Sequence, residues 1–402
     1  MLNPLRIIQP DYQLLVPVLG ALICGAIMVP SAAVTLGDSI WLKHWTYLLL
    51  GLLAFGTVVL LPTRLFALLH VPALMLALVL CALVLVPGLG LEDNGARRWL
   101  NLGFFTLQSA EHAKVLMLIY VAGFLARHGE QVAALRLELF EPIAALIVLS
   151  TLLLAAPDFG SMVVIGLVAL GLLFVAGVRL RLFALLASVA VIGGAVVAVA
   201  APYRVERLLA FIDPWSNAFG SAYQLTQSLI AFGRGSYFGV GLGSGVQKLH
   251  YLPESHNDFI FAVVVEELGL VGGLLLIALF AALILRLLSL GRQAVRQDFW
   301  FGAYLLYGVA FLLGGQFLIN VGVSSGALPT KGLTLPLVSF GGNALLATGV
   351  LLGLACRAQY ELHSDLLAPR QRRAAHRARR PRAPAAPVRR AAAKRTAAER
   401  RR

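Results

Sequence analysis

Ten long apolar stretches dominate the chain and restrict what it can fold into. A helix that crosses the hydrocarbon core of a bilayer needs roughly 20 mostly apolar residues, and it satisfies its own backbone hydrogen bonds. Hydrophobic residues make up 59% of the 402 and charged residues only 13%, which is too little polar surface for a soluble domain. We therefore predict an all-α polytopic membrane protein with about ten transmembrane helices, near residues 13–35, 45–63, 71–90, 109–127, 141–157, 161–178, 182–202, 258–286, 301–323 and 341–360.

The positive charge is concentrated at the C-terminal end. The formal net charge is +14, and the segment from Ala368 onward holds fourteen Lys and Arg residues and one acid, Glu399. A basic, Ala/Pro-rich segment without aromatic residues is typical of a disordered tail beside an anionic leaflet, with specific protein docking as the alternative. We predict a short cytoplasmic N-terminus (1–12), a ten-helix transmembrane domain (13–360) and a basic disordered cytoplasmic tail (361–402).

Basic residues in the short loops predict the orientation. Arg and Lys are enriched in cytoplasmic loops, and the loops near Arg64, 127–136, Arg179 and 286–296 carry mainly basic charge. The loops on the opposite side, which include the two longest and chemically most varied segments, are 36–44, 91–108, 158–160, 203–257 and 324–340. We expect a bacterial inner-membrane protein whose functional face is periplasmic.

The longest external loop, 203–257 between the seventh and eighth spans, contains two unusual segments. Gln224 to Phe232 is apolar enough to lie in the membrane interface or to re-enter the membrane. Six glycines between Gly233 and Gly245 then allow sharp bends and close approach to a ligand, with tight packing at the membrane surface as the structural alternative. The run is not a phosphate-binding P-loop, because no Gly-Lys-Ser/Thr follows it.

Acidic residues gather where the eighth span begins. Asp258 stands at the water boundary, Glu254 precedes it by four residues, and Glu266 and Glu267 lie two turns deeper. Acids within membrane segments cost roughly 2.5–3.5 kcal/mol on insertion scales, so they usually face an internal cavity. Asp258 could cap the helix, act in catalysis or bind a partner, and its position alone leaves these open.

Further polar groups recur at the same predicted edge of the membrane. Arg97 and Arg98 precede the fourth span, and Glu111 and Lys114 are three residues apart within it, close enough to pair on one helix face. Lys331 lies in a segment with two prolines and three glycines, which predicts a shaped loop. Carboxylate, guanidinium and ammonium groups beside lipid suit an amphiphile with an anionic head, because cations bind diphosphate and acids handle protons.

Five motifs occur in order along residues 12–360: Gly95-Ala-Arg-Arg-Trp-Leu-Asn101, Pro157-Asp-Phe-Gly160, Tyr223-Gln-Leu-Thr-Gln-Ser-Leu-Ile-Ala-Phe-Gly-Arg-Gly235, Leu252-Pro-Glu-Ser-His-Asn-Asp-Phe259 and Pro329-Thr-Lys-Gly-Leu-Thr-Leu-Pro-Leu-Val-Ser-Phe-Gly-Gly342. Together they resemble the SEDS (FtsW/RodA/SpoVE) family of peptidoglycan polymerases, and its FtsW branch in division more than its RodA branch in elongation. The resemblance implies ten transmembrane helices and an inverting glycosyl transfer that polymerises lipid II with release of undecaprenyl diphosphate.

The resemblance also implies roles for particular residues. Asp258 matches the family's external catalytic aspartate and would act, ionised, as the general base, with Glu254 as a supporting acid. The candidates for binding the substrate and its diphosphate are Lys114, Glu111, Arg97, Arg98, Lys331, Gln227 and Arg234. No His/Cys/acid cluster has metal-ligand spacing, so metal ligands stay unassigned, and a divalent cation such as Mg²⁺ or Mn²⁺ stays an open alternative to the basic residues.

The implied partners are lipid II, the growing glycan strand, a class B penicillin-binding protein transpeptidase of the FtsI type and other divisome membrane proteins, at the division septum and without nucleic acid. Two rival functions remain. A lipid II flippase would depend on polar groups such as Glu111 and Lys114 inside the membrane. A non-catalytic divisome scaffold would only recruit the transpeptidase.

Overall fold

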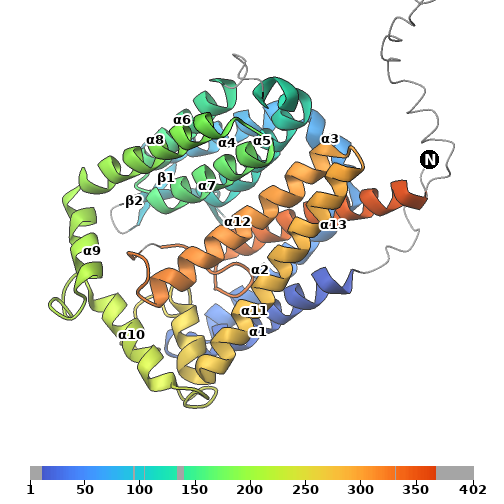
Figure 1. Ribbon diagram of the computed structural model, residues 1–402. Helices are drawn as coiled ribbons and strands as arrows, with labels where there is room; N and C mark the ends of the chain where they lie inside the picture. The colour runs from blue at the N-terminus through green and yellow to red at the C-terminus, as the bar shows by residue number, and fades with distance from the viewer. Residues whose placement is uncertain (1–10, 94–95, 104, 134–139, 331, 368–402) are drawn as a thin grey trace, which may run out of the picture. The chain divides into compact units, whose positions relative to one another are not determined.

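The computed structural model describes residues 11–93, 96–103, 105–133, 140–330 and 332–367, and most of them are helical (Figure 1). Six helices are long and apolar enough to cross a membrane: α1 Tyr12–Ala32, α2 Asp38–Leu60 (its span starts at Ser39), α5 Ser109–Ala133 (its span ends at Gly129), α8 Leu180–Val199, α11 Ile260–Arg296 and α12 Trp300–Ser324. Three apolar helices are shorter: α4 His70–Leu85, α6 Phe140–Ala155 and α7 Phe159–Val175. With α13 Gly342–Leu367, each predicted span falls on a helix, which confirms the polytopic helical class.

Three helices continue beyond the predicted spans. α11 runs to Arg296, so the segment 286–296, predicted as a loop, is helical. α5 continues to Ala133 and α13 to Leu367. The segments beyond the apolar runs are rich in Arg, Gln, Leu and Ala, which are good helix formers, so the helix outlasts its hydrophobic stretch.

A small sheet in the loop 91–108 departs from the predicted all-α class. β1 Gly90–Asp93, β2 Ala96–Asn101 and β3 Thr106–Gln108 form an antiparallel sheet in the order β1-β2-β3. Asn-Gly, the dipeptide between β1 and β2 in the sequence, is typical of tight hairpin turns. Hairpins need only short segments, so the hydropathy of the long spans did not reveal this one.

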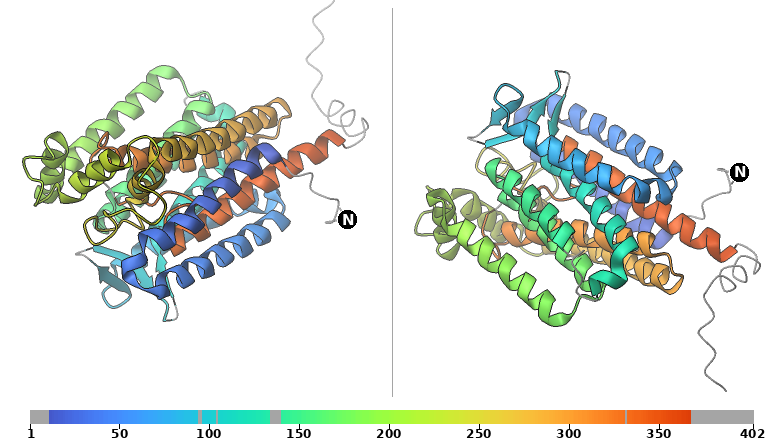
Figure 2. Two further views of the ribbon diagram at one scale, coloured as in Figure 1. Left: turned by 90° about the horizontal axis from the view of Figure 1, so that it is seen from below. Right: turned by 90° about the horizontal axis from the view of Figure 1, so that it is seen from above.

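The loop 203–257 is itself partly helical. α9 Pro202–Ile212 follows α8, and α10 Tyr223–Gly235 packs on α11 and α12 with Leu225 and Ala231 buried. Both views of Figure 2 place the sheet and the pair α9–α10 at the same end of the bundle. Two predicted external loops, 91–108 and 203–257, therefore lie at the same end of the fold.

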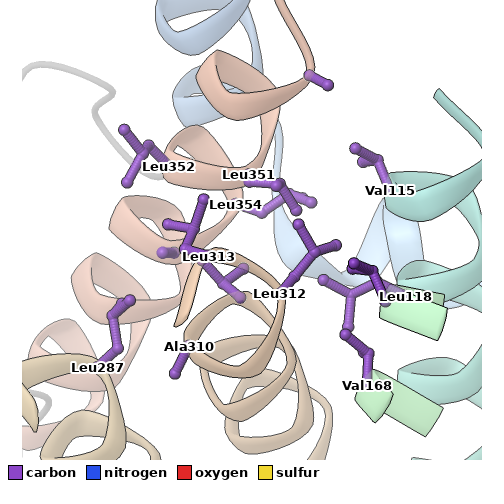
Figure 3. Close-up of a cluster of buried hydrophobic side chains, with 14 of the residues drawn as sticks. Val115, Leu118, Val168, Leu287, Ala310, Leu312, Leu313, Leu351, Leu352 and Leu354 are labelled. Atoms are coloured by element: carbon purple, nitrogen blue, oxygen red, sulfur yellow. The ribbon is translucent and has the colours of Figure 1, made fainter. Parts of the chain in front are cut away.

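The core lies around α12, which packs against α5, α7 and α11. Leucine, valine and alanine side chains from α5, α7, α11, α12 and α13 interdigitate there, including Leu118, Val168 and Leu313 (Figure 3). α8 is the opposite case, because none of its residues is buried. The remaining short helices are α3 Thr63–Leu68 and the 3₁₀ turn η1 Val34–Leu36. The chain divides into two compact units, Met1–Leu362 and His363–Arg402, and the core belongs to the first.

Candidate active site at the start of α11

Asp258 lies in a series of turns that leads into α11. The helix begins at Ile260 with Phe259 at the N-cap position and without a side-chain cap, so Asp258 does not cap it. The buried Leu252 and Phe259 anchor the two ends of the segment. Glu254 is exposed and adopts a left-handed φ of 55°, and its Oε2 accepts a hydrogen bond from Asn257 Nδ2 at 2.6 Å.

The loop between α12 and α13, together with Asn320 of α12, holds the Asp258 segment in place. Asn320, near the end of α12, donates from Nδ2 to the carbonyl of Asp258 at 2.8 Å and to the carbonyl of Leu333 at 2.7 Å. Ser339 Oγ donates to the carbonyl of Asn257 at 2.6 Å. These bonds tie three separate chain segments together around one carboxyl group.

Gly332 lies directly against the Asp258 carboxylate. A Cβ added at position 332 would lie 3.0 Å from Asp258 Oδ2. That distance is tight, so a side chain at 332 would push the carboxylate away. Glycine at this position therefore lets the loop backbone approach the acid closely.

The environment changes the acidity of Asp258. Burial raises the pKa of Asp258 from its ordinary value of 3.8 to about 7, and the negative charge of Glu254 raises it further, whereas Arg98 and Arg207 oppose the rise. Desolvation therefore outweighs the nearby positive charges. A carboxyl group with a pKa near 7 can take up and release a proton at neutral pH.

His256 beside it behaves differently. Burial lowers the pKa of His256 below 6.5, so its ring is mainly neutral at pH 7. Its ring lies 5.7 Å from that of Phe340, centroid to centroid. The contact packs the His256 ring against the loop between α12 and α13.

The two arginines of β2 have different environments. Arg98 Nη2 donates to the carbonyl of Pro157 at 2.5 Å, and its buried Nε has no partner among the described residues. Arg97 forms an exposed ion pair with Glu92 at 3.1 Å. Of the two, Arg98 is the one whose charge acts on the pKa of Asp258.

Glu111 and Lys114 form a buried ion pair of 2.7 Å within α5, as their spacing predicted. Lys114 lines a small cavity with apolar residues of α5, α7 and α12. The charged groups that shift the pKa of Asp258 are Glu254, Arg98, Arg207 and Asp158. The Glu111–Lys114 pair is not one of them.

The remaining predicted site residues are dispersed. Gln227 is half-buried on α10. Arg234, at the end of α10, pairs through Nε with Glu266 Oε1 at 3.0 Å, in a network separate from Asp258. Lys331 lies outside the described residues. No group of three or more His, Cys, Asp or Glu side chains within the described ranges could hold a metal ion, so we assign no metal ligands.

Sequence reasoning missed three participants. Asn320 was hidden in an apolar span, although an amide inside such a span is itself a signal of an internal hydrogen bond. Arg207, on α9, was one of several charged residues in a long loop. Gly332 was counted only as a loop former, since its proximity to Asp258 depends on the fold.

The fold and the site together define a class of protein. It is a polytopic helical membrane protein with a desolvated carboxyl group, that of Asp258, at the end of its bundle where irregular segments lie together. A family model described as a cell cycle protein, of the FtsW/RodA/SpoVE type, matches residues 12–364. The chain belongs to this family, as the sequence motifs predicted.

Several known proteins are similar over most of their length. A probable peptidoglycan glycosyltransferase FtsW of Coxiella burnetii is 44% identical over 358 residues, which cover 87% of this chain and 96% of that protein. The corresponding protein of Nitrosococcus halophilus is 46% identical over 373 residues, covering 90% and 95%.

Two solved structures have folds similar to that of this chain. A chain of a peptidoglycan synthase complex that coordinates polymerization and crosslinking matches with a TM-score of 0.73 and 30% identity, over 89% of this chain and all of that one. RodA of Thermus thermophilus matches with a TM-score of 0.66 and 28% identity, over 87% and 97%.

Proposed function

We propose that this protein is a peptidoglycan glycosyltransferase that polymerises lipid II into glycan strands during septal wall synthesis, with Asp258 as its general base. The enzyme class follows from membership of the family and from identities of 44–46% to the relatives named above. The environment of Asp258 supports this role. Its carboxyl group is desolvated and its pKa is raised to about 7, and it lies among Arg207 of α9, Arg98 of β2 and the last external loop.

The chemistry is an inverting displacement. A sugar hydroxyl of one lipid-linked substrate attacks the anomeric carbon of another, and a C–O bond forms as the bond to the polyprenyl diphosphate breaks. Asp258, ionised, accepts the hydroxyl proton, and the diphosphate leaves with the electron pair. A positioned general base contributes typically ~10²–10⁴-fold in rate, and it works best with a pKa near the operating pH.

Positive charge near the acid suits the leaving group. Arg98 and Arg207 both act on Asp258, and a guanidinium group binds phosphate oxygens in a bidentate manner. We assign Arg98 to the diphosphate in preference to Arg97, because Arg97 is paired with Glu92 at the surface. Lys114 would act through its pair with Glu111 on the shape of α5 rather than on the diphosphate directly.

The proposed location is the inner membrane at the septum with the Asp258 end periplasmic. Arg64, Arg127 and Arg179 fall in or beside connections between spans on the side predicted to be cytoplasmic. A class B penicillin-binding protein is the proposed partner, since a structurally similar chain comes from a complex that couples polymerization with crosslinking.

The test is polymerisation of lipid II by the purified protein and by Asp258→Asn, each with and without the transpeptidase. We expect the variant to lose at least ~10²-fold in rate while its thermal unfolding midpoint is retained. Glu92→Gln, on the same end of the bundle, is the matched control and should polymerise normally. Normal polymerisation by Asp258→Asn would refute the role of the acid, and lipid II flipping by both forms without any polymerisation would favour the transporter.

A further inference from the structure

The glycine-rich segment Ser236–Gln247 carries no charged residue and exposes large apolar side chains. Phe238 is 84% exposed, Tyr237 68% and Leu242 55%. Large contiguous apolar patches are rarely left in water, and they mark contacts with a membrane or a protein. The segment therefore needs a covering that the described residues do not supply.

The segment is joined to a membrane-spanning surface. α11 is kinked at Gly269, whose φ is 73°. Just past the kink, Leu270 N donates to the carbonyl of Ser236 at 2.9 Å and Val271 N to that of Tyr237 at 3.2 Å. Leu270 and Val271 are exposed residues of the long apolar span of α11. The apolar side chains of the segment thus continue the lipid-facing surface of this helix.

Two buried carboxylates satisfy the backbone of the segment. Glu266 accepts hydrogen bonds from Val246 N at 3.0 Å and from Gln247 N at 3.2 Å, and Glu267 accepts one from Gly243 N at 2.9 Å. Irregular backbone at membrane depth is tolerated only where protein satisfies its polar groups. These two side chains, together with carbonyl groups that the kink frees, provide such partners.

The charges of the two acids are balanced by residues at the ends of the segment. Arg234 pairs with Glu266 at 3.0 Å, and Lys248 pairs with Glu267 at 2.6 Å. Ser31 of α1 donates to Glu267 and accepts from Lys248 at 2.7 Å. Because buried ions are stable only when paired, the network favours a fixed conformation of the segment.

We propose that Ser236–Gln247 is a membrane wedge whose apolar side chains lie at the boundary between headgroups and acyl chains, in the leaflet at the Asp258 end of the bundle. Lipid is the occupant that the structure favours, since the patch continues a transmembrane surface and the segment itself contains no charged residue. The wedge does not depend on glycosyl transfer. It would hold the turns that carry Asp258 at a constant depth, because Leu252 N bonds to the carbonyl of Gln247 at 2.7 Å.

The test is site-directed spin labelling of the full chain in nanodiscs of phosphatidylethanolamine and phosphatidylglycerol. A label on Phe238→Cys is compared with labels on Leu274→Cys, in the span of α11, and on Glu92→Cys, in β1. Power saturation with oxygen and with a nickel chelate reports depth, and the unmodified chain gives the background from its own cysteines. We expect label 238 to favour oxygen, as label 274 does, and label 92 to favour the nickel chelate.

Two outcomes would overturn the wedge. Label 238 could be as accessible to the nickel chelate as label 92, which would place the segment in water. It could also lose that accessibility only when the transpeptidase is added, which would make the segment a protein-docking surface. A second variant tests the cause: Phe238→Asp, with the label moved to Leu242→Cys, should shift that label from oxygen toward nickel accessibility, and an unchanged profile would contradict the proposal.

Discussion

Two sets of acids near the start of α11 have opposite environments: Asp258, just before the helix, and Glu266 and Glu267, within its first turns. Asp258 has no ion pair or hydrogen bond to its carboxylate within the part of the chain that the structure describes, and burial raises its pKa to about 7. Glu266 and Glu267 are more deeply buried, yet each has a cationic partner and backbone amide donors. Asp258 can therefore exchange a proton near neutral pH. Glu266 and Glu267 instead bind the backbone of the glycine-rich segment and hold it in place.

The two sets of acids are distinguished by whether described residues pair with them. Their positions in the sequence are similar, at or near the start of one apolar helix. The two sets differ in whether a cation pairs with the carboxylate. A buried carboxyl group without such a pair lowers the stability of the fold, so it is typical of a site that uses it.

The largest effect on stability is expected from Lys248→Met. The substitution leaves the buried carboxylate of Glu267 without its cation, and breaking a buried pair in this way costs about 3–5 kcal/mol. The thermal unfolding midpoint should fall clearly, and the double variant Glu267→Gln/Lys248→Met should recover most of the loss. A single variant as stable as the parent would mean that the pair is dispensable.

The pH dependence of polymerisation is the next test. Asp258 must be ionised to act as a base, so with its pKa at about 7 the rate should fall about tenfold per pH unit well below 7 and level off above it. Rates measured from pH 5 to 9 on protein with its partner present give the profile. A flat profile down to pH 5 would show that the carboxyl group stays ionised.

A smaller effect distinguishes the adjacent arginines of β2. Arg98→Gln removes a charge that acts on Asp258 and should reduce polymerisation about tenfold, which corresponds to ~1.4 kcal/mol. Arg97→Gln removes only an exposed pair with Glu92 and should change the rate little. Equal losses in the two variants would contradict the placement of Arg98.

The last test concerns the stability of Asp258→Asn. Because the folded-state pKa lies above the ordinary 3.8, ionisation disfavours the folded state, and this penalty grows as pH rises from about 4 to 7. The variant lacks the penalty, so its unfolding midpoint should exceed that of the parent at pH 8 and match it at pH 4. A lower midpoint at pH 8 would indicate a structural role for the acid.

The predicted and observed features differ in a consistent way. Each of the ten predicted spans falls on a helix, since hydropathy is a property of contiguous residues. The Glu111–Lys114 pair was equally local, three residues apart on one helix. The sheet β1–β3 and the helical course of 286–296 were missed, because long apolar windows do not report hairpins or polar helix ends.

Within the site, the motif around Asp258 drew attention to the acid, but its surroundings did not follow from the motif. The bonds of Asn320 join residues 62 and 13 positions away in the chain, and Glu267 meets Ser31 across 236 positions. Arg234, one of the candidates for binding the substrate and its diphosphate, pairs with Glu266 across 32 positions. Such pairings depend on which loops the bundle brings together.

By itself, the amino-acid sequence determined the class of protein, the placement of its spans and the identity of the acid at the head of α11, since these are written in short stretches of apolar and polar residues. The tertiary structure decided which acids are paired and which one is left with a pKa near neutrality. The physical reason is that desolvation and charge compensation are set by neighbours distant in the chain, and only the folded arrangement specifies those neighbours.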